Sequence, residues 1–224
     1  MSLAVTTVNA TIKTILRVLC RIDAAALDSV PLTGPLILVA NHVNFLEVPL
    51  VFTHLQPRQV TGFAKAETWD NPFLGPLFDL WKAIPLRRGE VDVRAIRRAL
   101  HVLEEGGILA IAPEGTRSGD GRLRKAHPGV VTLALLSNAP ILPMVYYGGE
   151  LFGENMRRLR RTDFKIVVGQ PFCIDARGVK VTNKIRQRIL EEIMYRLAVL
   201  LPPAYRGYYK NLESSSQEFL HFLL

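Results

Sequence analysis

The sequence predicts a single α/β domain with a mixed, mostly parallel sheet flanked by helices. Two observations support this fold class: short strands that are apolar on both faces, and amphipathic helices that alternate with them along the chain. The clearest strands are residues 36–40 (LILVA) and 106–112 (GGILAIA). Between them, residues 92–105 repeat apolar side chains at helical spacing on one face and arginines on another. The three segments therefore form a strand–helix–strand repeat.

Residues 3–20 predict an amphipathic N-terminal helix, because apolar residues recur at helical spacing while Lys13 and Arg17 fall off that stripe. The stripe consists of Leu3, Val8, Ile12, Ile15, Leu16 and Leu19. Two interpretations stay open. The helix docks on the core, or it lies in a membrane interface with its cations toward the lipid headgroups.

The second half of the chain continues the alternation of helices and strands. We expect a helix at 129–138, a strand-like apolar run at 141–147, a strand at 164–169 and a helix at 183–201. Pro202 and Pro203 end the last helix. This predicts a membrane-associating helix and linker over 1–30, an α/β domain over 31–210 and a C-terminal tail over 211–224.

The composition excludes a disordered chain, because 49% of the 224 residues are hydrophobic. The 28 Lys and Arg residues exceed the 20 Asp and Glu residues, which leaves a net charge of +8. Such an excess fits nucleic acid, an anionic membrane surface or an anionic substrate. Cys20 and Cys173 show neither disulfide nor zinc spacing, which favours a reducing compartment and no metal. No apolar run predicts a spanning helix or an export signal.

The first polar cluster follows the strand 36–40 directly and contains Asn41, His42 and Glu47. Five residues on a continuous helix rotate a side chain by about 500°, so His42 and Glu47 would point to different faces of one helix. They pair if the chain turns between them and a helix begins at Glu47. The pair would then be a histidine base with an orienting carboxylate. The plain alternative is two polar residues on a surface turn.

Two further clusters carry arginines at strand ends. The segment 84–90 ends in Arg87 and Arg88, which suit bidentate phosphate recognition, although such pairs are more often solvated. The segment 111–118 (IAPEGTRS) breaks a buried strand into a loop whose glycine, hydroxyl and cation suit a phosphate or an oxyanion. That loop contains Glu114, Gly115, Thr116 and Arg117.

The fourth segment, residues 139–149, is apolar and ends in glycines. A core strand is its plain interpretation. Its functional interpretation is an acyl pocket walled by Ile141, Pro143 and Met144.

In this order and spacing, the four segments resemble the glycerophospholipid acyltransferase family, the PlsC-like 1-acylglycerol-3-phosphate acyltransferases. His42 and Glu47 resemble the family's first block, in which Asp follows His after four residues. Residues 84–90 resemble the second block, residues 113–118 (PEGTRS) match the third without change, and residues 139–143 resemble the fourth. The resemblance covers about 36–150, with looser similarity over 201–209. Glu47 departs from the family's Asp by one methylene.

The resemblance implies transfer of a fatty acyl group from acyl-CoA or acyl carrier protein to the free hydroxyl of a lysophospholipid, typically 1-acylglycerol 3-phosphate. His42 would be the general base and Glu47 its orienter, with no acyl-enzyme and no cofactor beyond the acyl donor. Substrate-binding residues would be Asn41, Arg87, Arg88, Glu114, Gly115, Thr116 and Arg117. We expect a peripheral, monotopic location on the cytoplasmic face of the cell membrane. The oligomeric state stays open.

Two alternatives compete with this hypothesis. One is a protein that keeps the fold and binds lipid with weak or no activity, which the replacement of Asp by Glu47 motivates; a relative of it is an acyltransferase for a different lysolipid. The other is a nucleic-acid binder, motivated by the basic run at 157–161. No aromatic side chains interleave with that run, so we expect no nucleic-acid partner.

Overall fold

The computed structural model describes residues 3–87 and 92–223. The helices are α1 (Leu3–Leu19), α2 (Glu47–His54), α3 (Leu74–Leu80), α4 (Val93–Glu104), α5 (Gly129–Ser137), α6 (Phe152–Arg157) and α7 (Asn183–Leu200). The strands are β1 (Cys20–Asp23), β2 (Leu36–Ala40), β3 (Val60–Lys65), β4 (Ile84–Leu86), β5 (Ile108–Ile111), β6 (Ile141–Tyr147), β7 (Thr162–Val168), β8 (Phe172–Ile174) and β9 (Leu220–Phe222).

Within the described residues, nine strands form one mixed sheet in the order β1-β7-β6-β2-β5-β3-β4, with β8 beside β6 and β9 beside β8. The pairs from β6 through β2, β5 and β3 to β4 are parallel, and β1 is parallel to β7. Antiparallel pairing occurs where β6 meets β7 and β8, and where β8 meets β9. The predicted fold class, an α/β domain with a mostly parallel mixed sheet, is confirmed.

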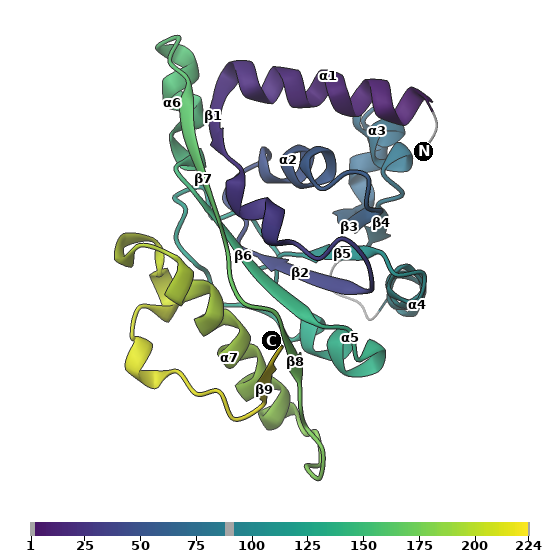
Figure 1. The fold of residues 1–224 in the computed structure, drawn as a ribbon, viewed down its shortest axis with the longest axis vertical. Helices are drawn as coiled ribbons and strands as arrows, with labels where there is room; N and C mark the ends of the chain where they lie inside the picture. The colour runs from purple at the N-terminus through teal and green to yellow at the C-terminus, as the bar shows by residue number, and fades with distance from the viewer. Residues whose placement is uncertain (1–2, 88–91, 224) are drawn as a thin grey trace.

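Helices cover both faces of the sheet (Figure 1). On one face, α1 and α2 pack over Leu36 and Leu38; on the other, α4, α5 and α7 pack over Ile37 and Val39. Every residue of β2 is buried, because successive side chains of this central strand enter opposite cores. This explains why the strand carries no polar alternation in the sequence.

Both ends of the chain contribute a strand to the sheet, which corrects the expected domain boundaries. β1 lies within the segment expected as helix and linker, yet Cys20 to Asp23 pair with Thr162 to Lys165 of β7. β9 lies within the expected tail, yet Leu220 to Phe222 pair with β8. The α/β domain therefore extends beyond 31–210 in both directions. Neither strand has a strong sequence signal, since each is short and lies at an edge of the sheet.

The helix α1 is apolar on two sides, which corrects the single stripe expected from the sequence. Leu16 is buried, and the side chain of the buried Asn9 accepts a hydrogen bond of 2.9 Å from the Trp81 indole. Leu3 and Ile15 instead point outward and are 83% and 51% exposed. The helix thus docks on the core with one side and leaves apolar residues on the other.

Candidate active site

The candidate site lies at one edge of the sheet, where parallel strands end. β2, β5, β3 and β4 are neighbours and run in the same direction, so their carboxyl ends meet there. Ligands of open α/β sheets bind at this edge. His42 follows β2, the loop 112–118 follows β5, and Arg87 follows β4. The fold therefore gathers three of the four predicted clusters at one edge.

His42 and Glu47 pair through the predicted turn. The chain leaves β2 at Ala40 and α2 begins at Glu47, with Pro49 in its first turn. Nδ1 of His42 lies 3.1 Å from Oε2 of Glu47. The His42 side chain is 22% exposed and that of Glu47 is 4% exposed. A buried carboxylate therefore fixes one ring nitrogen and leaves Nε2 available for chemistry.

Asn44 holds the turn between the two residues, and sequence reasoning missed it. Its backbone N–H donates to Oε1 of Glu47 at 2.9 Å. Its side-chain oxygen accepts from the backbone N–H of Leu46 at 2.8 Å, and its side-chain nitrogen donates to the Gly149 carbonyl at 2.7 Å. An asparagine that accepts from the backbone N–H two residues further on is a common signal for such a turn.

Glu114 does not reach a substrate, which corrects its expected role. The residue is 3% exposed, and both carboxylate oxygens accept backbone hydrogen bonds: from His42 at 2.9 Å and from Arg124 at 2.7 Å. Burial raises the pKa of Glu114 to about 7, although these two hydrogen bonds act in the opposite direction. The side chain is thus a buried brace between three segments.

The rest of the loop runs alongside the His42 turn. The backbone N–H groups of Ser118 and Gly119 donate to the carbonyls of His42 and Val43, at 2.7 and 3.0 Å. Thr116 and Arg117 are exposed, and in the described part of the chain their backbone N–H groups have no acceptor. Gly115 adopts φ +67°, which favours glycine. The loop therefore offers free donors and one cation beside His42.

Asn41 is also a brace rather than a substrate ligand, which is a second correction. It is 3% exposed. Its side-chain nitrogen donates to the Tyr146 carbonyl at 2.9 Å, and its side-chain oxygen accepts from the Tyr146 N–H at 2.8 Å. These bonds extend the pairing of β2 with β6 by one residue. They fix the position at which the chain turns toward His42.

The predicted arginine pair is described only in part. Arg87 is exposed at the end of β4, whereas Arg88 lies outside the described residues. β4 is three strands from β2, so Arg87 lies roughly 14 Å along the edge from the end of β2. Lys65, at the end of β3 and in register with Leu86, is an exposed cation between the two. Neither β3 nor Lys65 was predicted from the sequence.

The residues expected to line an acyl pocket do not lie on one side of the sheet. Ile141 belongs to the core under α4, α5 and α7, whereas Met144 belongs to the core under α1 and α2. Both are 0% exposed, and Pro143 is buried as well. Successive residues of a strand face opposite sides of the sheet, so 141 and 144 cannot line one channel.

The segment 201–209 clamps the chain that follows the loop. The Leu123 N–H donates to the Tyr205 carbonyl at 3.0 Å, and the Tyr208 N–H donates to the Leu123 carbonyl at 2.9 Å. The Tyr209 hydroxyl accepts from the Ala126 N–H at 3.2 Å. Leu123 precedes Arg124, whose N–H bonds to Glu114. The C-terminal segment therefore supports the site through Leu123, Arg124 and Glu114.

No metal-binding cluster is present among residues 3–87 and 92–223: no three His, Cys, Asp or Glu side chains gather there as ligands would. In the same ranges no helix combines the length and apolar character needed to cross a membrane.

A histidine oriented by a buried carboxylate, next to free backbone donors and cations, defines a class of enzyme site that activates a hydroxyl beside an anionic group. The chain belongs to the acyltransferase family, whose model, described as Acyltransferase, matches residues 21–147. The match includes the His42 turn and the loop 112–118.

Among similar curated proteins, the 1-acyl-sn-glycerol-3-phosphate acyltransferase of Limnanthes alba is 37% identical over 118 residues, 51% of this chain and 42% of that protein. The lyso-ornithine lipid O-acyltransferase of Pseudomonas aeruginosa is 33% identical over 132 residues, 56% of this chain and 50% of that protein. The chain thus spans about half the length of these curated relatives.

Among solved structures, the fold is similar to the crystal structure of the 1-acyl-sn-glycerophosphate (LPA) acyltransferase PlsC from Thermotoga maritima. The TM-score is 0.62 and the identity 20%, over 88% of this chain and 79% of that one. At this identity the likeness supports the fold.

Proposed function

We propose that this protein is an O-acyltransferase that moves a fatty acyl group from a thioester of coenzyme A or acyl carrier protein to the free hydroxyl of 1-acylglycerol 3-phosphate. The observation that carries the proposal is the His42–Glu47 pair at the carboxyl edge of the sheet, 3.1 Å apart and joined to the loop 112–118. Family membership supports the acyl transfer, and the name of the Limnanthes alba relative supports this acceptor.

His42 acts as the general base. With Nδ1 held by Glu47, Nε2 accepts the proton of the acceptor hydroxyl as its oxygen attacks the thioester carbonyl carbon. The carbon–sulfur bond then breaks, and the leaving thiolate takes the proton back from the imidazolium. Glu47 stabilises the charged ring between the two steps. No acyl-enzyme forms along this path.

The loop 112–118 supplies the electrostatic part of the reaction. The free N–H groups of Thr116 and Arg117 stabilise the oxyanion of the tetrahedral intermediate, an effect typically worth about 10²–10³ in rate. The Arg117 side chain, with Arg87 and Lys65 along the same edge, attracts the acceptor phosphate. Cations spread along an edge suit a phosphate that lies away from the reacting hydroxyl.

We also place the protein on the cytoplasmic face of the membrane, held peripherally by α1. Apart from Arg17, the exposed residues of that helix are uncharged. Leu3, Ile15 and Val18 are exposed, and the hydroxyls of Thr7, Thr11 and Thr14 donate to helix carbonyls four residues earlier. These hydroxyls need no water, so α1 presents methyl groups to a lipid interface.

The test is an acyl-transfer assay on purified protein with lysophosphatidate and each donor type, following thiol release and the lipid product by mass spectrometry. We expect phosphatidate from the wild type and a loss of at least about a thousandfold in His42→Ala. His101→Ala, on the exposed face of α4, is the matched control. Near wild-type turnover in His42→Ala would remove His42 as the base. A wild type that binds lipid without turnover would favour the lipid-binding alternative.

A second acceptor is favoured by one specific observation, the 33% identity to a lyso-ornithine lipid O-acyltransferase. Both acceptors present a hydroxyl to the same base. A mixture of lysolipids in the same assay separates them, because the product masses differ. A product made only from a lysolipid without phosphate would overturn the phosphate role of Arg117.

A further inference from the structure

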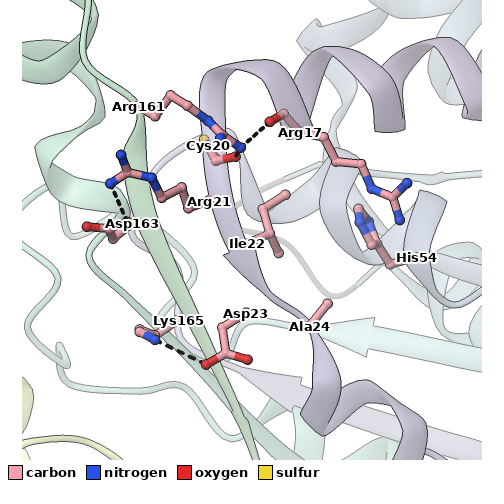
Figure 2. A pocket seen from close by; sticks show the side chains of 10 residues that line it. All are labelled: Arg17, Cys20, Arg21, Ile22, Asp23, Ala24, His54, Arg161, Asp163 and Lys165. Atoms are coloured by element: carbon pink, nitrogen blue, oxygen red, sulfur yellow. Dashed lines mark hydrogen bonds and ion pairs between the residues drawn. The ribbon is translucent and has the colours of Figure 1, made fainter.

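A cavity of about 710 Å³ lies on the side of the molecule that carries α1, between the ends of α1 and α2 and the strands β1 and β7 (Figure 2). Its lining includes four Lys or Arg side chains and two Asp side chains. None of the residues assigned above to acyl transfer lines this cavity. The cavity is therefore a separate, positively charged feature.

Both acidic side chains of the cavity are already paired. Arg21 lies 3.4 Å from Asp163, and Lys165 lies 3.1 Å from Asp23. Arg161 donates to the carbonyls of Arg17 and Cys20, at 2.5 and 2.7 Å, where α1 ends. These contacts, drawn as dashed lines in Figure 2, hold the rim of the cavity in place. Among the described lining residues they leave Arg17 as the cation whose side chain has neither a carboxylate nor a carbonyl partner.

Arg17 extends toward His54, at the end of α2, as Figure 2 shows. Burial lowers the pKa of His54, and the positive charges of Lys13 and Arg17 lower it further. Nδ1 of His54 lies 3.0 Å from the Leu50 carbonyl, which leaves Nε2 free. Arg17 and His54 thus line the cavity together, and the charge of Lys13, one helical turn before Arg17, acts on His54 as well. No carboxylate forms an ion pair with any of the three in the described part of the chain. An anion that enters this cluster relieves their repulsion.

We propose that this cavity binds the phosphate group of an anionic lipid headgroup. Phosphate oxygens accept from guanidinium and imidazole donors together, which the lining residues Arg17 and His54 present, and the nearby Lys13 adds positive charge. Lys13 and Arg17 flank the uncharged outer face of α1, so an α1 that lies in the interface places the cavity at the depth of the headgroups. The proposal rests on the membrane location proposed above for the source of the ligand.

The test is sedimentation with phosphatidylcholine vesicles that contain phosphatidate or phosphatidylserine at equal surface charge. The double variant Lys13→Gln/Arg17→Gln removes one charge from the cavity lining and the charge of Lys13, which acts on His54 from the preceding turn of α1. The variant Arg94→Gln/Arg97→Gln removes two charges from exposed positions on α4, across the sheet. We expect the cavity variant to bind phosphatidate vesicles at least about tenfold more weakly than the α4 variant. Equal losses in the two variants would overturn the proposal, because they would mean unspecific attraction.

Two further experiments test the source of the phosphate and detect binding without any variant. Inorganic phosphate and coenzyme A are added as soluble competitors of vesicle binding. If coenzyme A releases the protein from the vesicles at a concentration well below the one at which inorganic phosphate does, the lipid assignment is overturned. In the wild type, addition of short-chain phosphatidate should shift the NMR signals of the His54 ring and leave those of His101 in place. An unmoved His54 would also overturn the proposal.

Turnover with dispersed lysophosphatidate, without vesicles, keeps this proposal apart from the proposed function. We expect the cavity variant to match the wild type in that assay. A wild type that lacks turnover but still binds phosphatidate vesicles through Arg17 would overturn the proposed function alone. A wild type that turns over but shows no difference between the two variants on vesicles would overturn the cavity alone.

Discussion

The backbone N–H of His42 donates a hydrogen bond of 2.9 Å to the side chain of Glu114, which lies 72 residues further along the chain. The bond joins the end of β2 to the loop after β5. The second oxygen of the same carboxylate accepts from Arg124, so one buried group sets the positions of His42 and of the loop beside it. Because burial raises the pKa of Glu114 to about 7, the charge of this brace changes near neutral pH.

Glu114→Gln should flatten the dependence of stability on pH. A carboxyl with a pKa near 4.5 unfolded and about 7 folded holds its proton more tightly in the folded state, so the free energy of unfolding falls as pH rises from 4.5 to 7. The fall amounts to about 3 kcal/mol. Urea unfolding at several pH values measures it. We expect the variant to be less stable at pH 5, since its amide cannot accept at both positions, but to lose less by pH 8.

The control for this prediction is Glu104→Gln, an exposed position on α4. It should follow the wild-type curve. A Glu114→Gln curve that runs parallel to the wild type between pH 4.5 and 7 would show that Glu114 does not titrate there.

Glu47→Asp should reduce turnover, although Asp is the residue expected from the resemblance. The Glu47 carboxylate reaches both His42 Nδ1, at 3.1 Å, and the Asn44 N–H, at 2.9 Å. A side chain shorter by one methylene cannot keep both contacts in this turn. A displacement of about 1 Å at a catalytic group can cost up to roughly 100-fold in rate, so we expect a loss of 10- to 100-fold.

Steady-state kinetics with a saturating acceptor checks this prediction, with Glu67→Asp on the surface as the matched substitution. A gain in turnover would instead mean that Glu47 weakens the site and that the turn relaxes around Asp.

Asn41→Ala should lower stability rather than substrate affinity. The substitution removes both partners of the Tyr146 backbone, whose N–H and carbonyl are buried in the sheet. Each orphaned group costs about 1–3 kcal/mol, so we expect a loss of about 3 kcal/mol in the free energy of unfolding. Asn211→Ala, at an exposed turn, is the control. A raised KM with unchanged stability would restore Asn41 as a substrate ligand.

The His42–Glu47 pair could be located from the sequence because the contact is local. His42 and Glu47 lie five residues apart, and the geometry of a helix already required a turn between them, which the structure contains. The long helix α7 and the central strand β2 were equally accessible, since strong periodicity or complete burial marks them. Local patterns of this kind survive in the fold because nothing distant competes with them.

The roles of Asn41 and Glu114 were not accessible, because they depend on partners about 70 to 105 residues away. A polar residue in a motif is equally compatible with a ligand and with a backbone brace, and only burial separates the two. The opposite faces of Ile141 and Met144 were accessible, since strand alternation places residues three apart on different sides. β1 and β9 stayed hidden because short edge strands carry little pattern.

Gly207→Ala should destabilise the protein by about 2–4 kcal/mol and lower turnover with it. Gly207 adopts φ +50°, and a Cβ there would lie 2.2 Å from the Leu123 carbonyl oxygen. That oxygen accepts from the Tyr208 N–H, so the clash breaks this hydrogen bond and displaces Leu123 and the following Arg124. Arg124 in turn bonds to Glu114, and Glu114 bonds to His42. A backbone change in the C-terminal segment thus reaches His42 through Leu123, Arg124 and Glu114.

Gly178→Ala separates backbone strain from the clash. Gly178 also has a positive φ, +77°, but a Cβ there would meet nothing within 4 Å. Gly178→Ala should therefore lower the free energy of unfolding only by the strain of a left-handed backbone, about 1–2 kcal/mol. It should leave the turnover of the folded protein unchanged. Thermal unfolding and turnover per folded molecule, measured for both variants, decide the matter. If Gly207→Ala matches Gly178→Ala in both measurements, the C-terminal segment does not brace the site.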